Sequence, residues 1–157
     1  MDNYKVATDI VKELFSRDYQ FAMATTANNI PSLRFIDTYF DNGAFYAITY
    51  SNTKKVKEIA DNPNVSLCCR KGYSFIGKAY NIGHPLMPEN GEIRSKLLKA
   101  FEPWYFKHNN ENDEICILKI VPEKGFVYED GLGYDIDFIN KAVNTKPFNF
   151  NTILTVE

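Results

Sequence analysis

Three stretches of the chain space their apolar residues as an amphipathic helix does. In residues 3–16 the apolar positions recur every three or four residues, at Val6, Ile10 and Leu14, with Val11 and Phe15 beside them. Residues 53–61 and 91–101 repeat this spacing. Because an α-helix turns once in about 3.6 residues, each set gathers on one face. The pattern therefore predicts three helices, each packed by one side.

Short segments rich in β-branched and aromatic residues alternate with turn residues elsewhere. They cover residues 21–26, 31–40, 44–49, 65–69, 73–80, 115–121 and 125–128. The run Asp41-Asn42-Gly43 is a strong hairpin signal, and Lys71-Gly72 marks another turn. Tight turns join antiparallel strands. We predict a mainly β (α+β) fold, a small antiparallel β-barrel with helices at its ends.

The pattern weakens toward the C-terminus. Residues 130–133 (Asp-Gly-Leu-Gly) are typical of a turn, and residues 140–157 show neither helical nor strand periodicity. There is no repeat, linker or compositional break. We therefore predict one domain over residues 1–157, with its core in about 5–128 and a C-terminal extension in 129–157.

Composition narrows the classes of function. The formal net charge of the 157 residues is −2, which argues against nucleic acid or an anionic membrane as a partner. We expect no signal peptide, because the first residues lack a basic start followed by an apolar run, and no apolar run approaches the roughly 20 residues of a membrane span. Cys68, Cys69 and Cys116 form no C-x-x-C motif. We expect reduced thiols in a cytoplasmic protein, with no metal site.

The candidate chemistry lies in residues 34–55. Arg34 is in one predicted strand, and hydroxyl residues between Thr49 and Thr53 lead into a helix whose first turn holds Lys54 and Lys55. Cations are unfavourable at a helix N-terminus, and a bound anion would reverse that penalty. Arg and Lys together suit a phosphate group. The alternative is a solvated helix start with ordinary surface lysines.

An ordered set of segments resembles the pyridoxamine 5′-phosphate oxidase-like family of FMN-binding split barrels. The segments are Phe21-Ala22-Met23-Ala24-Thr25, Pro31-Ser32-Leu33-Arg34, residues 45–55, residues 62–67 and Gly77-Lys78-Ala79. The resemblance covers about residues 5–128. It implies a six-stranded antiparallel split β-barrel with flanking helices, and a homodimer with FMN bound at the subunit interface.

The resemblance also implies the cofactor-binding residues. Arg34 would contact the FMN phosphate, and Thr53 and Lys55 would complete a phosphate clamp with Lys54 adjacent. The ribityl chain and ring edge would be lined by Thr49, Tyr50 and Ser51. The isoalloxazine would be flanked by Phe35, Ile36 and Asp37.

One difference from the true oxidases of this family changes the expected substrate. The true oxidases carry an Arg-Leu-His-type substrate motif near the C-terminus, whereas residues 134–140 here read Tyr-Asp-Ile-Asp-Phe-Ile-Asn. The chain is more similar to the short, general-stress or nitroimidazole-resistance-like branch. We expect an FMN-dependent oxidoreductase acting on an unknown small molecule. Hydride transfer at a flavin needs no protein acid or base in its minimal form, so no catalytic residue is predicted.

Several other interpretations stay open. A protein that holds flavin or haem without turnover is the alternative function, and an apo barrel used for oligomerisation is a weaker one. His84 is the candidate haem ligand, although loop histidines are usually structural. Asp135 and Asp137 would share one strand face, which is weak evidence for a metal. Residues 104–106 (Trp-Tyr-Phe) are core residues or an aromatic wall over a flavin.

Overall fold

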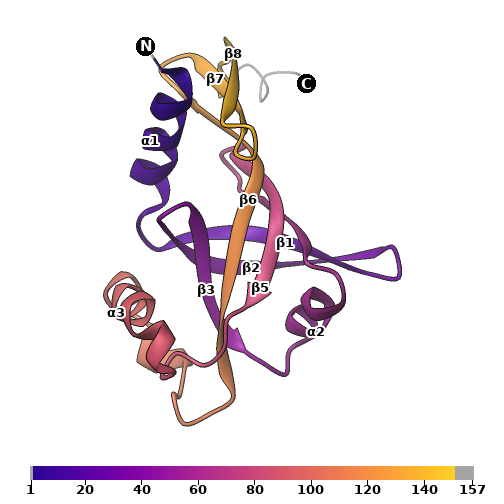
Figure 1. Cartoon of the computed structure of the whole chain (residues 1–157), viewed down its shortest axis with the longest axis vertical. Helices are drawn as coiled ribbons and strands as arrows, with labels where there is room; N and C mark the ends of the chain where they lie inside the picture. Colours follow the sequence, from indigo (N-terminus) through magenta and orange to yellow (C-terminus); the bar gives the residue numbers. More distant parts are fainter. Residues whose placement is uncertain (1, 151–157) are drawn as a thin grey trace.

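The computed structural model describes residues 2–150, which form one continuous sheet with helices around it (Figure 1). The strands are β1 (Tyr19–Ala27), β2 (Ile30–Asp41), β3 (Ala44–Tyr50), β4 (Asn64–Cys68), β5 (Ser74–Asn81), β6 (Ile115–Glu129), β7 (Leu132–Asp137) and β8 (Ala142–Pro147). The helices are α1 (Asn3–Phe15), α2 (Lys54–Asp61), α3 (Gly91–Ala100) and α4 (Tyr105–His108), with a 3-10 turn η1 (Pro88–Asn90).

The first six strands close into the predicted antiparallel barrel. The sheet order is β3-β2-β1-β4-β5-β6-β7-β8, and β3 also pairs with β6, from Phe45 opposite Ile120 to Tyr50 opposite Ile115. Every strand pair is antiparallel. The fold is a six-stranded split barrel of the α+β class, as the sequence predicted.

Residues with left-handed backbone conformations form the hairpin turns, including the one predicted at Asp41-Asn42-Gly43. Between β2 and β3, Asn42 and Gly43 have φ angles of 44° and 85°, and Asn28 and Asn29 turn β1 into β2 with φ angles of 51° and 62°. Two residues of positive φ match the right-handed twist of the flanking strands, and Asn and Gly tolerate that conformation best.

Aromatic side chains fill the barrel. Phe15, at the end of α1, has its ring centroid 5.2 Å from that of Phe21, 5.7 Å from Phe45 and 5.5 Å from Phe75. All four side chains are fully buried. Helix α1 begins after Asp2, whose side chain accepts hydrogen bonds from two first-turn amides, and it buries the apolar face that the spacing predicted. Aromatic side chains are thus a large part of the barrel core.

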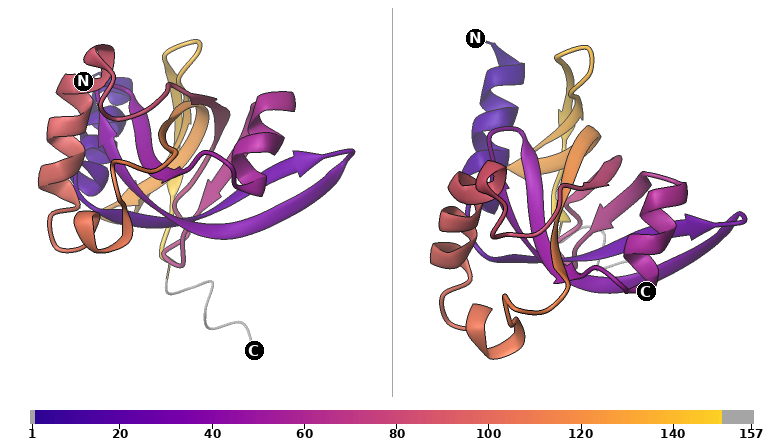
Figure 2. Two further views of the ribbon diagram at one scale, coloured as in Figure 1. Left: turned by 90° about the horizontal axis from the view of Figure 1, so that it is seen from below. Right: turned by 60° about the horizontal axis from the view of Figure 1, so that its bottom comes forward.

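A second apolar cluster holds α3 and α4 against the outside of the barrel. Leu97, Phe101 and Tyr105 pack there with Ile117 of β6. Figure 2 shows α3 and α2 on opposite sides of the barrel. The predicted helix over residues 91–101 is confirmed, whereas the short α4 falls in a region where the sequence predicted no helix. No helix in residues 2–150 is both long enough and apolar enough to cross a membrane.

Strand β6 corrects one sequence prediction. Residues 115–121 and 125–128 belong to one strand, because Glu123 is accommodated as an extra residue where the register shifts between Ile76 and Gly77. A Cβ at Gly77 would lie 2.1 Å from the carbonyl oxygen of Val121, so the two strands approach closely only because this residue is glycine. Pro122 has no N–H to donate to the ladder, and it is tolerated here because the bulge interrupts the regular hydrogen bonding.

The C-terminal region is more ordered than the sequence predicted. Only Asp130 and Gly131 form the turn; Leu132 and Gly133 already belong to β7, and residues 142–147 form β8. Asp135 pairs with Lys146 at 2.8 Å, and Asp137 accepts hydrogen bonds from Ile139 and Asn140, so both carboxylates have structural partners. The part of the predicted extension in residues 151–157 lies outside the described residues.

Candidate functional site

A pocket of about 210 Å³ opens beside the carboxyl end of β3. Five parts of the chain meet there: the middle of β2, the end of β3, the first turn of α2, the segment around α4 and Leu118 of β6. The lining consists of Phe35, Ile36, Asp37, Ala47, Ile48, Thr49, Tyr50, Lys55, Trp104, His108, Asn109 and Leu118. Six of the ten residues predicted to bind a cofactor are among them.

The segment around α4 supplies one wall of the pocket, in which sequence reasoning proposed the aromatic run but missed His108 and Asn109. Trp104, His108 and Asn109 line the pocket, and the indole Nε1 of Trp104 donates to Asp18 Oδ2 at 2.7 Å. The three residues of the aromatic run 104–106 lie in different surroundings. Trp104 lines the pocket, Tyr105 is buried in the core, and Phe106 is 67% exposed. The core interpretation is thus confirmed for Tyr105, whereas a flavin against Trp104 stays a prediction. The aromatic run itself was the signal for this wall.

An ion pair anchors this wall. Arg94 of α3 donates from Nε and Nη2 to the two carboxylate oxygens of Glu111, each at 2.8 Å, and Tyr105 donates its hydroxyl to Glu111 at 3.0 Å. These bonds lower the pKa of Glu111, with the Arg94 hydrogen bond as the largest cause. A two-point Arg–carboxylate pair fixes orientation as well as distance. The segment that carries Trp104 and His108 is therefore held in place by residues that do not themselves line the pocket.

Lys55 lies at the other end of the pocket, with the guanidinium of Arg34 close enough to affect its charge. Lys55 is partly buried, and burial followed by the charge of Arg34 lowers its pKa. Burial also lowers the pKa of Arg34. Within residues 2–150 no carboxylate forms an ion pair with Lys55. Two like charges held together in partial burial favour an anion between them.

The start of α2 adds amide groups to this end. Thr53 is the N-cap residue, yet its side chain caps no first-turn amide; its hydroxyl donates to the carbonyl of Tyr50 at 2.9 Å. Ser51 likewise donates to the carbonyl of Glu114 at 2.9 Å. The first-turn amides of α2 thus lack a side-chain cap and can meet an anion. Ser51 and Thr53 lie outside the lining of the pocket, so their roles in a cofactor site stay predictions.

Arg34 and Lys54 also lie outside the lining, and both approach Glu58. Lys54 is largely exposed and its Nζ is 3.6 Å from Glu58 Oε1. Arg34 Nη1 donates to Thr25 Oγ1 at 2.7 Å and to the carbonyl of Met23 at 3.1 Å, while Nη2 is 3.9 Å from Glu58 Oε2. Arg34 is therefore held in place by Thr25, the carbonyl of Met23 and Glu58. The predicted contact of Lys54 with a phosphate stays a prediction.

Asp37 and His108 both line the pocket, and their charges interact. Burial raises the pKa of Asp37, the nearby charge of Asp18 adds to this, and His108 opposes it. Tyr50 donates its hydroxyl to the backbone carbonyl of His108 at 3.4 Å. This end of the pocket thus combines an aromatic wall with groups that can accept or donate protons.

His84, the candidate haem ligand, has both ring nitrogens engaged. Its Nδ1 accepts from the amide of Leu86 at 3.1 Å, and its Nε2 lies 3.2 Å from the carbonyl oxygen of Asp113. A ring that accepts at Nδ1 must donate from Nε2 to that carbonyl. Neither nitrogen is left for an iron, so a structural role for this histidine is favoured.

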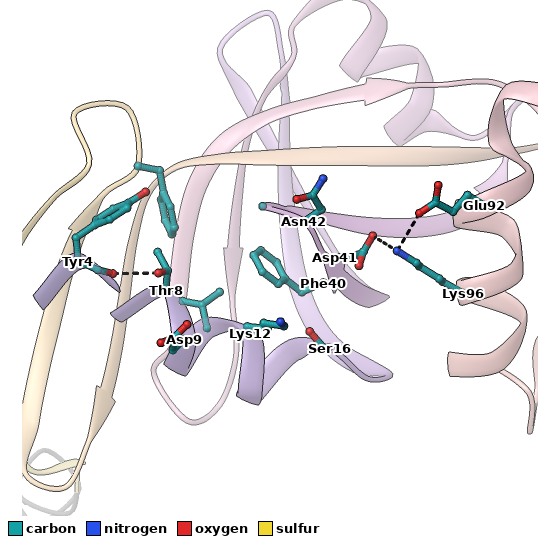
Figure 3. A pocket seen from close by; sticks show the side chains of 13 residues that line it. Tyr4, Thr8, Asp9, Lys12, Ser16, Phe40, Asp41, Asn42, Glu92 and Lys96 are labelled. Atoms are coloured by element: carbon teal, nitrogen blue, oxygen red, sulfur yellow. Dashed lines mark hydrogen bonds and ion pairs between the residues drawn. The ribbon is translucent and has the colours of Figure 1, made fainter. Parts of the chain in front are cut away.

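A larger groove of about 560 Å³ lies between α1, the β2–β3 turn and α3 (Figure 3). Its lysine on α3 is already paired with carboxylates: Lys96 Nζ is 2.8 Å from Asp41 Oδ2 and 3.3 Å from Glu92 Oε1. None of the predicted cofactor residues lines it. The size of this groove therefore does not make it the better candidate for an anionic ligand.

Known proteins share both the sequence pattern and the fold. The family model described as Pyridoxamine 5'-phosphate oxidase matches residues 7–127. General stress protein 26 of Bacillus subtilis (strain 168) is 28% identical over 105 residues, which cover 65% of this chain and 74% of that protein.

Solved structures agree in fold. General Stress Protein 26 from Bacillus anthracis str. Sterne superposes with a TM-score of 0.59 at 20% identity, covering 80% of this chain and 93% of that one. A pyridoxamine 5'-phosphate oxidase-related, FMN-binding protein from Nostoc punctiforme PCC 73102 gives 0.53 at 13% identity, covering 92% and 95%. With a barrel of the predicted topology and a family match over most of its length, the chain belongs to the pyridoxamine 5′-phosphate oxidase family.

Proposed function

We propose that this protein is an FMN-dependent oxidoreductase acting on a small molecule, in a homodimer with the cofactor at the subunit interface. The observation that carries the proposal is the pair Arg34 and Lys55, whose pKa values are both lowered by burial, with Lys55 in the uncapped first turn of α2. An anion is the group that such an arrangement lacks. A phosphate on a flat ligand would meet it there.

The residues present fit FMN at both ends. At the phosphate end, Arg34 offers a planar fork, Lys55 a point charge and α2 its free amides. At the ring end, Phe35, Ile48, Leu118 and Trp104 are apolar, as a flavin ring requires. Bound FMN would supply the hydride chemistry. The protein residues would hold the phosphate, orient the ring against Trp104 and keep water from its covered face.

We propose that a second copy of the chain packs over the solvent-exposed side of this pocket. The pocket volume of about 210 Å³ lies below the roughly 300–1,000 Å³ of ligand pockets. Phe35, which lines the pocket, is 72% exposed, and Leu33 and Ile76 are 71% and 57% exposed. The strand register puts Leu33, Ala24, Ser66 and Ile76 in one row across β2, β1, β4 and β5. An apolar sheet face of this kind suits an isologous contact with itself.

The test of this proposal is spectroscopic. The purified protein is mixed with FMN, passed through gel filtration and examined by visible absorption, and the bound flavin is then exposed anaerobically to NADH or NADPH. We expect co-eluting flavin bands that bleach with one of the two donors. Bands that persist with both donors would favour a flavin-binding protein without turnover. A colourless protein that takes up no FMN would refute the proposal, and a Soret band would replace flavin by haem.

A further inference from the structure

Glu58 is the one charged side chain in residues 2–150 that is buried, and it lies directly behind Arg34. It accepts hydrogen bonds from the hydroxyl of Thr25 and, at 3.3 Å, from the hydroxyl of Ser32. These bonds, with the charges of Lys54 and Arg34, lower the pKa of Glu58, the Thr25 bond being the largest cause. Glu58 is therefore an ionised carboxylate within reach of the arginine predicted to bind a phosphate.

Arg34 does not close onto this carboxylate. Its Nη1 donates to Thr25 Oγ1 at 2.7 Å, whereas the approach of its Nη2 to Glu58 Oε2 is 3.9 Å. An ionised carboxylate can only accept, so the single hydroxyl proton of Thr25 is directed at Glu58 and its lone pair is left for Arg34. Thr25 thus stands between the two charges and satisfies both.

The guanidinium consequently keeps part of its donors unused. Among the described residues both hydrogen bonds of Arg34 leave from Nη1, one to Thr25 and one to the carbonyl of Met23. The groups Nε and Nη2 remain for another acceptor. A direct two-point pair with Glu58 would occupy two guanidinium nitrogens and turn the fork away from an incoming anion.

We infer that Thr25 is a positioning residue for phosphate binding: placed between Glu58 and Arg34, it keeps the guanidinium from pairing with the carboxylate and leaves its free N–H groups for a phosphate. This inference rests on the proposed function, since it assigns how the phosphate end of that site is kept open. Thr25 itself does not touch the ligand.

The experiment compares FMN with riboflavin, which has the same ring but no phosphate, by flavin fluorescence titration of the ligand-free protein. Thr25→Val keeps the side-chain shape and removes the hydroxyl, so Arg34 should close onto Glu58. We expect its preference for FMN over riboflavin to fall about tenfold. The matched control is Thr38→Val, because Thr38 is an equally buried strand threonine whose hydroxyl donates to the carbonyl of Tyr19 at 2.9 Å. It should leave that preference unchanged.

Glu58 provides the second arm. In Thr25→Val/Glu58→Gln no carboxylate remains to capture Arg34, so the preference for FMN should recover although the hydroxyl is still missing. Glu58→Gln alone should keep or increase the preference, because the amide oxygen of the new side chain still accepts from Thr25 and carries no charge to repel a phosphate. These outcomes would not follow if Thr25 only supported the fold.

The outcomes separate the two proposals. Wild-type protein that prefers FMN, with an unchanged preference in Thr25→Val or a reduced one in Glu58→Gln, overturns the positioning role and leaves the proposed function standing. If Thr25→Val does not fold, Glu58→Gln alone decides in the same way. Wild-type protein that does not prefer FMN over riboflavin overturns both the phosphate assignment and this inference.

Discussion

Replacing Lys55 by methionine should weaken FMN binding and at the same time stabilise the fold. The methionine keeps the apolar stem and removes only the ammonium. A charge-assisted hydrogen bond contributes about 1.5–3 kcal/mol net, which corresponds to a loss of affinity of about ten- to a hundredfold. The pKa of Lys55 is lowered by burial and by Arg34, so its charge disfavours the ligand-free fold. Removing that charge should raise the melting temperature.

The assay is a pair of fluorescence titrations, with FMN and with riboflavin, beside a thermal melt of the ligand-free protein. Riboflavin affinity should change by less than about twofold, because riboflavin has no phosphate to lose. Lys57→Met is the matched control, since Lys57 is an exposed lysine of the same helix. An equal loss of FMN and riboflavin affinity in Lys55→Met, or unchanged FMN affinity, would refute the reasoning about the phosphate end.

Three further predictions concern pH, assembly and the barrel itself. Since the pKa of Lys55 lies below 10.5, FMN affinity should fall as pH rises toward that value; titrations across pH should show no such fall in Lys55→Arg. The ligand-free wild type should become more stable in the same window, because its native state loses the proton before the unfolded chain does. Leu33→Lys with Ile76→Lys should give a monomer by light scattering with weaker FMN binding, whereas an unchanged dimer would contradict the proposed interface. Gly77→Ala should reduce the urea unfolding free energy by about 1–3 kcal/mol, because its Cβ would lie 2.1 Å from a strand carbonyl.

The barrel was predictable because its signals are local. Paired Asn and Gly residues mark the hairpins, and helical spacing marks α1, α2 and α3. Strand β6 was harder, since Pro122 and the extra Glu123 interrupt the alternation that identifies a strand. Strand β8 was missed for a different reason. It is almost wholly exposed, so its sequence lacks the alternation of apolar and polar residues that a half-buried strand shows.

In the candidate site, too, the residues with a local sequence signal could be predicted and those placed by tertiary packing could not. Lys55 and residues 35–37 could be proposed from one stretch of sequence, because strand and helix positions there follow from local pattern and the family resemblance. His108 and Asn109 reach the pocket only through the packing of α3 and α4 on the barrel and through the Arg94–Glu111 pair. Thr25 and Glu58 are 33 positions apart in the chain, and no spacing rule joins them. The contact between Thr25 and Glu58 forms only when the folded barrel brings β1 and α2 together.

The pairing of β3 with β6 has a consequence for how the protein matures. Phe45 pairs with Ile120, so the seam that closes the barrel joins distant parts of the chain, whereas β1–β2 and β2–β3 are joined by tight hairpins. Closing a long loop costs more chain entropy and slows folding relative to local contacts. Leu118, a wall of the pocket, lies on that seam. A ligand of this pocket therefore finds its complete site only after β6 has paired with β3, late in the closure of the barrel.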